Sequence, residues 1–175
     1  MQLDAYAVRW EMVVSLAKEG KLQDALCSDR FESIVVGTTP WPSDSCVQYS
    51  EVAESYQSIR QSLPTATRTI ADAVIPPLIN MDFRPPNDLG MDTGGTLVLG
   101  SVSPSHVDGL LTSYAQLNYV DLDRAFDAMP AKRKSKLQIC TSGASERGFT
   151  GYLRQWETAL KYAHRCGAGI VLMTS

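Results

Sequence analysis

The chain has 175 residues, of which 44% are hydrophobic and 20% are charged, and its formal net charge is −3. This composition is typical of a folded globular domain and excludes a disordered chain or a strongly basic nucleic-acid binder. The longest apolar runs fall well short of the roughly 18 residues that a membrane-spanning helix needs, so we expect no membrane partner. The length predicts one domain, residues 1–175.

The N-terminus and the cysteines both bear on the cellular location of the protein. The sequence begins Met1-Gln2-Leu3-Asp4 and lacks a basic-then-apolar signal pattern, which predicts a cytoplasmic protein. The four cysteines are Cys27, Cys46, Cys140 and Cys166. Their spacing does not match a zinc or redox CxxC motif. We therefore predict no metal and no cofactor, with all four thiols free, reduced and buried.

Short strand and helix patterns alternate over the first 36 residues. We predict a strand over 5–8, a helix over 10–18 ending at Gly20, a short helix over 22–27 and a strand over 34–36. Residues 37–50 break this alternation with turn-forming residues. Trp41 lies there between two prolines, a context that excludes a regular helix.

Two helices and a second irregular segment follow. Ser50 is the predicted N-cap of a helix that runs to Leu63, and a further helix runs from Pro64 towards Pro76-Pro77. Residues 80–96 have no periodicity. Long irregular connections in compact domains are often functional or disordered. A strand is predicted over 96–99.

Helical patterns return after residue 101. Ser103 and Pro104 have the residue types of an N-cap and a first helical position. A short helix opening near Asp121 is predicted to end at Pro130. A basic cluster follows, made of Lys132, Arg133, Lys134 and Lys136. We predict a solvated loop there and no nucleic-acid partner, because the sequence pI is about 5.3 and aromatic residues do not interleave with the charges.

The last thirty residues carry the clearest pattern. A strand is predicted over 137–140, and an amphipathic helix then spans about 146–165. Its apolar positions recur every three or four residues: Phe149, Leu153, Trp156, Leu160 and Ala163. Gly167 is the predicted C-cap, and Ile170–Met173 is a predicted strand covered on both faces. The whole pattern predicts an α+β (mixed α/β) fold, a single layered domain with a small sheet packed by several helices.

Three segments of the second half carry a resemblance to a known family. They are the Ser-Pro-started helix at 102–107, the Asp-rich helix at 120–127, and the final helix and strand at 152–173. In order and local pattern they resemble the YfbM-like family of small bacterial proteins of unknown function. The resemblance covers under half of the chain. It implies a bacterial cytosolic α+β protein and carries no catalytic residue across.

The sequence offers few groups for catalysis. Its two histidines are His106 and His164, and we expect both to be structural or surface residues. The sequence lacks the GxxxxGK[ST], GxGxxG and GxSxG motifs. The alternative function is a hydrolase-like enzyme in which His106 activates a Ser or Cys nucleophile, with Cys46 or Cys140 as the thiol. We predict no catalytic residues and favour a protein that is not an enzyme.

The functional hypothesis concerns the two irregular segments, 37–49 and 80–95. We predict that they lie at one end of the domain and form a protein-binding surface, with a small-molecule pocket as the competing use. Its aromatic anchors would be Trp41 and Phe83, and the alternative for Trp41 is that it folds back onto the core. Its negative rim would be Asp44, Asp82, Asp88 and Asp92, suited to a basic partner such as a nuclease-type toxin. This predicts a non-catalytic bacterial immunity or regulatory protein. Its oligomeric state is left open.

Overall fold

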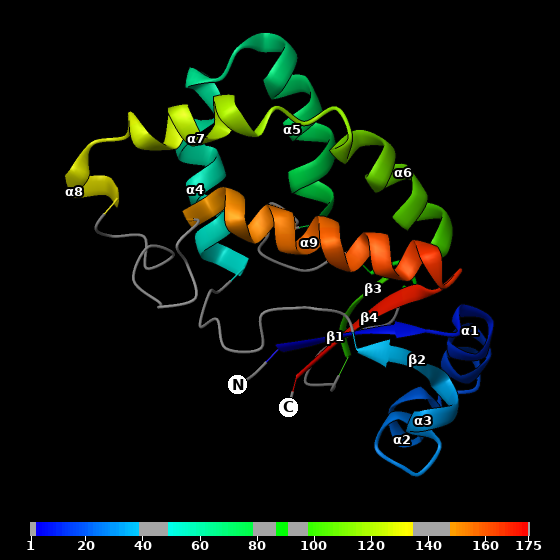
Figure 1. Ribbon diagram of the computed structural model, residues 1–175. Helices are drawn as coiled ribbons and strands as arrows, with labels where there is room; N and C mark the ends of the chain where they lie inside the picture. The colour runs from blue at the N-terminus through cyan, green and yellow to red at the C-terminus, as the bar shows by residue number, and fades with distance from the viewer. Residues whose placement is uncertain (1–2, 39–48, 79–86, 91–97, 135–147, 175) are drawn as a thin grey trace.

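The structure is a computed structural model that describes residues 3–38, 49–78, 87–90, 98–134 and 148–174 (Figure 1). Its strands are β1 (Leu3–Val8), β2 (Val35–Thr38), β3 (Val98–Val102) and β4 (Gly169–Thr174). They form a four-stranded antiparallel sheet in the order β2-β1-β4-β3. The last strand of the chain therefore lies in the interior of the sheet, as the sequence predicts.

Helices cover both faces of this sheet (Figure 1). One face carries α1 (Trp10–Lys18), α2 (Leu22–Leu26) and α3 (Phe31–Ile34). The other face carries the larger layer, α4 (Tyr49–Ile59), the 3₁₀ turn η1 (Arg60–Ser62), α5 (Thr65–Leu78), α6 (Pro104–Tyr114), α7 (Tyr119–Asp127) and α9 (Gly148–Arg165). A short helix, α8 (Ala131–Lys134), follows α7. The predicted α+β fold of one layered domain is confirmed.

β4 separates the two hydrophobic cores. Its side chains alternate, so Ile170 and Leu172 join the larger core with Trp156 of α9. Val171 and Met173 join the smaller core beneath α1 and α2. All four are buried. A strand with apolar side chains on both faces has no polar alternation, which is why the sequence shows an unbroken apolar run there.

Two predicted helix ends are confirmed by their backbone contacts. Ser103 is the N-cap of α6: its hydroxyl accepts from the backbone N–H of His106 at 3.3 Å, and Pro104 is the first helical residue. At the end of α9, Gly167 has φ +59°, a left-handed conformation that favours glycine. Both signals are local, so the sequence is sufficient to predict them.

Several predicted boundaries are wrong. Ile34 ends the unpredicted helix α3, and β2 begins one residue later; a helix of one turn has no periodicity to detect. Ser50 lies inside α4, which begins at Tyr49, and is therefore not its N-cap. The described part of β3 runs from Val98 through Gly100 and Ser101, whereas the prediction stopped at residue 99. Gly100 and Ser101 hid the second half of this strand because small residues are not typical of strand interiors.

Two predictions on exposed groups also need correction. The basic residues 132–134 belong to α8 and not to a loop. Cys27 and Cys166 are free, as predicted, but both are exposed, since each follows the last residue of a helix. Cys46, Cys140, Lys136 and the predicted strand at 137–140 lie outside the described residues.

The two edges of the sheet are protected in different ways. β2 has only four residues, and its pairing with β1 is irregular. Val35 pairs with Val8 and Gly37 pairs with Ala7, so Val36 between them has no partner residue in β1. The hydroxyl of Tyr162 also lies over Gly37. The outer edge of β3 carries Asn87, which forms a parallel bridge with Ser101. Short, irregular or covered edges prevent pairing with other chains. In the described part of the chain, the helices are too short or too polar to cross a membrane.

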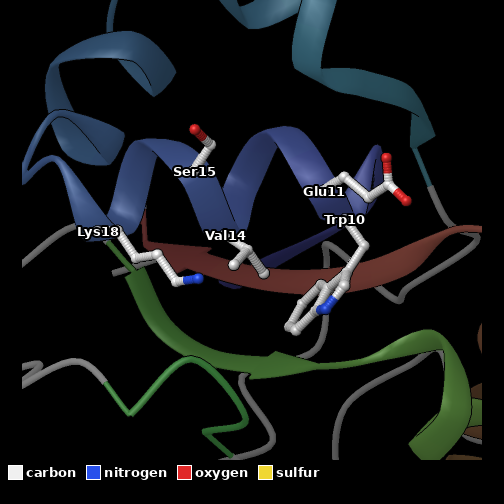
Figure 2. A pocket seen from close by; sticks show the side chains of 5 residues that line it. All are labelled: Trp10, Glu11, Val14, Ser15 and Lys18. Carbon is white, nitrogen blue, oxygen red and sulfur yellow. The ribbon is translucent and has the colours of Figure 1, made fainter.

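The start of β4 leaves no space for a side chain, which gives a first prediction. A Cβ atom on Gly169 would lie 2.3 Å from Cε3 of Trp10 and 2.9 Å from the carbonyl oxygen of Val102. The indole of Trp10 extends from α1 towards the sheet (Figure 2). Because the carbonyl belongs to the neighbouring strand, we expect Gly169→Ala to lower the free energy of unfolding by about 2–3 kcal/mol, measured by urea denaturation.

A matched control for this substitution is Gly109→Ala in α6. An added Cβ there meets no atom within 4 Å. Alanine is favoured over glycine in a helix interior, so we expect this variant to be more stable by about 0.5–1 kcal/mol. Equal unfolding free energies for Gly169→Ala and the parent chain would show that Trp10 and β3 yield to the new methyl group.

Candidate functional site

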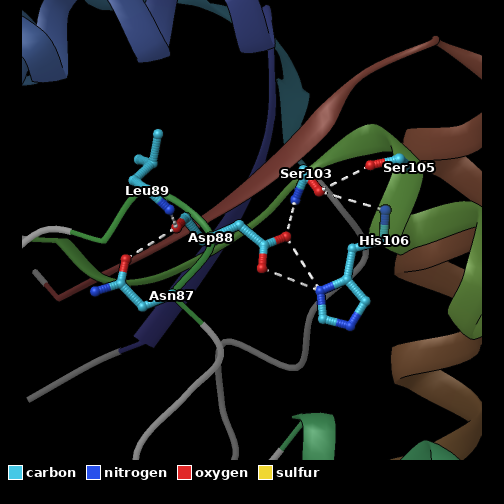
Figure 3. Close-up of polar contacts among 7 residues, drawn as sticks. Asn87, Asp88, Leu89, Ser103, Ser105 and His106 are labelled. Atoms are coloured by element: carbon cyan, nitrogen blue, oxygen red, sulfur yellow. Dashed lines mark hydrogen bonds and ion pairs between the residues drawn. The ribbon is translucent and has the colours of Figure 1, made fainter.

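The candidate site lies where β3 passes into α6. Ser103 alone separates the last residue of β3 from the first residue of α6. The turn at 87–90 lies against this junction, and Figure 3 shows the polar contacts between them. We call this group the Asp88 cluster; its members are Asn87, Asp88, Leu89, Ser101, Ser103 and His106.

The carboxylate of Asp88 is the centre of the cluster. Its Oδ2 accepts from the backbone N–H of Ser103 at 2.6 Å. Its two oxygens lie 3.2 and 3.1 Å from Nδ1 of His106. The side chains of His106 and Asp88 are 33% and 25% exposed. Since an ionised carboxylate only accepts hydrogen bonds, Nδ1 is the protonated nitrogen in this contact. Asp88 thereby fixes the orientation of the imidazole.

Ser101 attaches the turn to the sheet. Its side chain is fully buried, and its Oγ accepts from the N–H of Leu89 at 3.0 Å and donates to Oδ1 of Asn87 at 3.2 Å. Its carbonyl oxygen accepts from the N–H of Asp88 at 3.0 Å. The turn then closes with a bond from the N–H of Gly90 to the carbonyl of Asn87. A buried hydroxyl thus has its donor and its acceptor both satisfied.

An oriented imidazole is one requirement of the hydrolase alternative. Asp88 positions the ring as the acid of a catalytic triad would. The Oγ of Ser103, however, accepts from the backbone of His106, and it lies 3.3 Å from the Oγ of Ser105. This places Ser103 as a helix cap. Cys46 and Cys140 lie outside the described residues, so the nucleophile of that alternative stays a prediction.

The second histidine lies in a similar pair at the surface. Nδ1 of His164, in the last turn of α9, is 2.7 Å from Oδ1 of Asp108 in α6. Their side chains are 57% and 60% exposed. Exposed ion pairs contribute little to stability, because water screens them. Both histidines therefore occupy surface or structural positions, in agreement with the sequence-based expectation.

Most of the predicted binding residues fall outside the described residues: Trp41, Asp44, Asp82, Phe83 and Asp92. Asp88 is described, and its carboxylate contacts Ser103 and His106 of its own chain. Sequence reasoning missed the contact between Asp88 and His106, and it missed the buried Ser101. The available signal was a serine at 101 in an otherwise apolar strand, two residues before a capping serine.

The points where the irregular segments join the sheet are described. β2 ends at Thr38, which pairs with Tyr6 in β1. β3 begins at Val98, which pairs with Met173, and Met173 pairs with Asp4 on its other side. In this antiparallel sheet the last residue of β2 and the first residue of β3 lie at the same end of the sheet as both termini (Figure 1).

Polar contacts elsewhere hold the helix layer together. Asp72 of α5 accepts from Arg60 at 2.7 and 2.8 Å and from the hydroxyl of Tyr56 at 2.6 Å. The hydrogen bonds from Arg60 lower the pKa of Asp72, and burial followed by the Asp72 contact raises the pKa of Tyr56. The hydroxyl of Tyr119 donates to Glu157 at 2.8 Å, and burial raises the pKa of Tyr119. These networks join neighbouring helices and are structural.

Two hollows flank α1 and are separate from the Asp88 cluster. One, of about 410 Å³, is lined by Trp10, Glu11, Val14, Ser15 and Lys18 (Figure 2). The other, of about 320 Å³, is lined by Met12, Ser15, Leu16, Arg30, Ser33 and Ile34. Across the described ranges, His, Cys, Asp and Glu do not form a group of three that could hold a metal ion. The first hollow contains one acidic and one basic residue, Glu11 and Lys18, and the second lies between α1 and α3. Neither lining indicates a reaction.

Comparisons with protein-family models, with curated proteins and with solved structures found no match for this chain. The resemblance to the YfbM-like family therefore stays a prediction.

Proposed function

We propose that the chain is a non-catalytic protein-binding module, whose binding surface is formed by the irregular segments 37–49 and 80–95. One observation carries this proposal: Thr38, where β2 ends inside the first segment, and Val98, where β3 begins after the second segment, lie at the same end of the sheet. A segment that leaves a rigid sheet and a segment that enters it at the same end can contribute to one surface. A bacterial immunity or regulatory protein is the class that this surface fits.

The charges of the segments favour a basic partner. Together they contain Asp44, Asp82, Asp88 and Asp92, against the single basic residue Arg84. Asp88 does not lie at that end of the sheet, because its carboxylate contacts Ser103, which follows the last residue of β3, and His106. The acidic rim therefore consists mainly of the other three aspartates. Such a rim raises the association rate more than the affinity.

The test compares matched variants as capture baits in extracts of the cells that make the protein. The true partner is retained by the parent chain and by a Val120→Ala control, and is lost with Trp41→Ala. Val120 is suited to the control because it is 62% exposed on α7, in the outer helix layer. With the partner purified, we expect Trp41→Ala to weaken binding by about 2 kcal/mol, which is roughly 30-fold.

Kinetics then test the charge argument. Asp92→Lys should lower the association rate and reduce its dependence on salt, since long-range attraction between charges is screened by ions. If Trp41→Ala binds normally and Asp92→Lys leaves the association rate unchanged, the binding surface lies elsewhere and the proposal fails.

A further inference from the structure

The turn Asn87–Gly90 lies between two parts of the chain, 80–86 and 91–95, that the proposed function places in the binding surface. We propose that this turn is a strap that fixes the second binding segment to the body of the domain, and that the carboxylate of Asp88 is its anchor. The use of the strap rests on the proposed function. Its existence as a mechanical unit does not, and it can be tested on the free protein.

The strength of the anchor follows from its geometry. The N–H of Ser103 donates to Asp88 at 2.6 Å. Hydrogen bonds to a charged group are shorter and stronger than those between neutral groups. Ser103 is the N-cap of α6, a helix of 11 residues, and the positive end of a helix dipole favours a carboxylate. Nδ1 of His106 also lies 3.2 and 3.1 Å from the two oxygens of the same carboxylate. One carboxylate thus joins the strap to two residues of the β3–α6 junction.

The strap can open without unfolding the sheet. Asn87 and Gly90 are exposed, the side chain of Asp88 is 25% exposed, and Leu89, which packs against the smaller core, is partly buried. The strap is therefore held mainly by polar contacts. Segments of this kind open locally at a lower free energy than the whole domain. Releasing the anchor should free the strap while β3 stays paired with β4.

Two consequences follow from a closed strap. It covers the outer edge of β3, because the N–H of Asp88 bonds to the carbonyl of Ser101. It also holds the second binding segment at a fixed point, which reduces the conformational entropy lost when a partner binds. Asp88 is thus a positioning residue. Its role differs from that of the acidic rim, which acts through long-range charge.

The test measures amide hydrogen exchange by NMR in Asp88→Ala. Loss of the carboxylate removes the acceptor of the Ser103 N–H, so faster exchange at Ser103 is expected from any role. The deciding amides are those of residue 88 and Leu89, which donate to Ser101 and not to the Asp88 side chain. We expect both to exchange at least tenfold faster, while Val107 of α6 and Val171 of β4 keep their protection.

Two further variants keep the test decisive. Asp108→Ala is the matched control. It also removes an aspartate charge and an Asp–His contact of α6, the contact with His164. That contact joins α6 to α9 and does not involve the turn Asn87–Gly90. Asp108→Ala should leave Leu89 unchanged. Asp88→Asn retains an oxygen acceptor for Ser103 and should increase exchange at Leu89 less than alanine does. It also replaces the alanine variant if that variant does not fold.

The outcomes separate the strap from the proposed function. If Leu89 keeps its protection in Asp88→Ala, the carboxylate only caps α6 and the inference is overturned, whatever the partner. If Leu89 is released, the strap stands even where no partner is found. With a partner in hand, Asp88→Asn should lower affinity more through faster dissociation than through slower association, in contrast to Asp92→Lys.

Discussion

A chain that ends at Gly167 is expected to lose cooperative folding. The missing strand β4 pairs with β1 on one side and with β3 on the other, so its removal leaves both without a partner. It also removes four buried side chains that complete the two cores: Ile170, Val171, Leu172 and Met173. Deleting buried side chains of this size costs about 2–5 kcal/mol each, against a total stability of about 5–15 kcal/mol for a typical domain.

Circular dichroism during thermal unfolding is the measurement. The parent chain should show one sigmoidal transition, and the chain ending at Gly167 should show none. A chain ending at Thr174 is the control, because it keeps all of β4. An unchanged transition in the shorter chain would contradict the central position of β4.

The parts of the fold that the sequence predicts are those encoded by local pattern. The stripe of α9 from Leu153 to Ala163, the glycine after the helix and the apolar run of β4 are contiguous in the sequence, and each is confirmed. The cap of α6 is likewise set by adjacent residues, Ser103 and Pro104. Local signals of this kind need no knowledge of what packs against them.

The candidate site depends on contacts between residues that are distant in the sequence. Asp88 meets Ser103 and His106 only because the turn at 87–90 lies along β3. Sequence alone places Asp88 among other acids and suggests a charged rim. Ser101 also depends on distant residues: its hydroxyl is tolerated in a buried strand because it forms hydrogen bonds with Asn87 and Leu89. The pattern of a single chain cannot reveal such pairings.

Trp156→Ala is expected to be the most damaging single substitution described for this chain. Trp156 is 0% exposed to solvent, and it is the largest fully buried side chain among the described residues. It lies in the larger core with Ile170 and Leu172, so its loss leaves a cavity between α9 and the sheet. We expect a loss of about 3–5 kcal/mol in unfolding free energy and roughly 10 °C in Tm, measured by circular dichroism.

Trp10→Ala provides the comparison on the other face of the sheet. Trp10 is only partly buried and packs against the smaller core, so its removal should cost less than that of Trp156. The two residues pack on opposite sides of β4, and the costs of distant substitutions add within about 0.5 kcal/mol. The double variant should therefore lose the sum of the two single losses. A loss for Trp156→Ala below about 1 kcal/mol would contradict its place in the core, and a non-additive double variant would show that β4 transmits strain between the two cores.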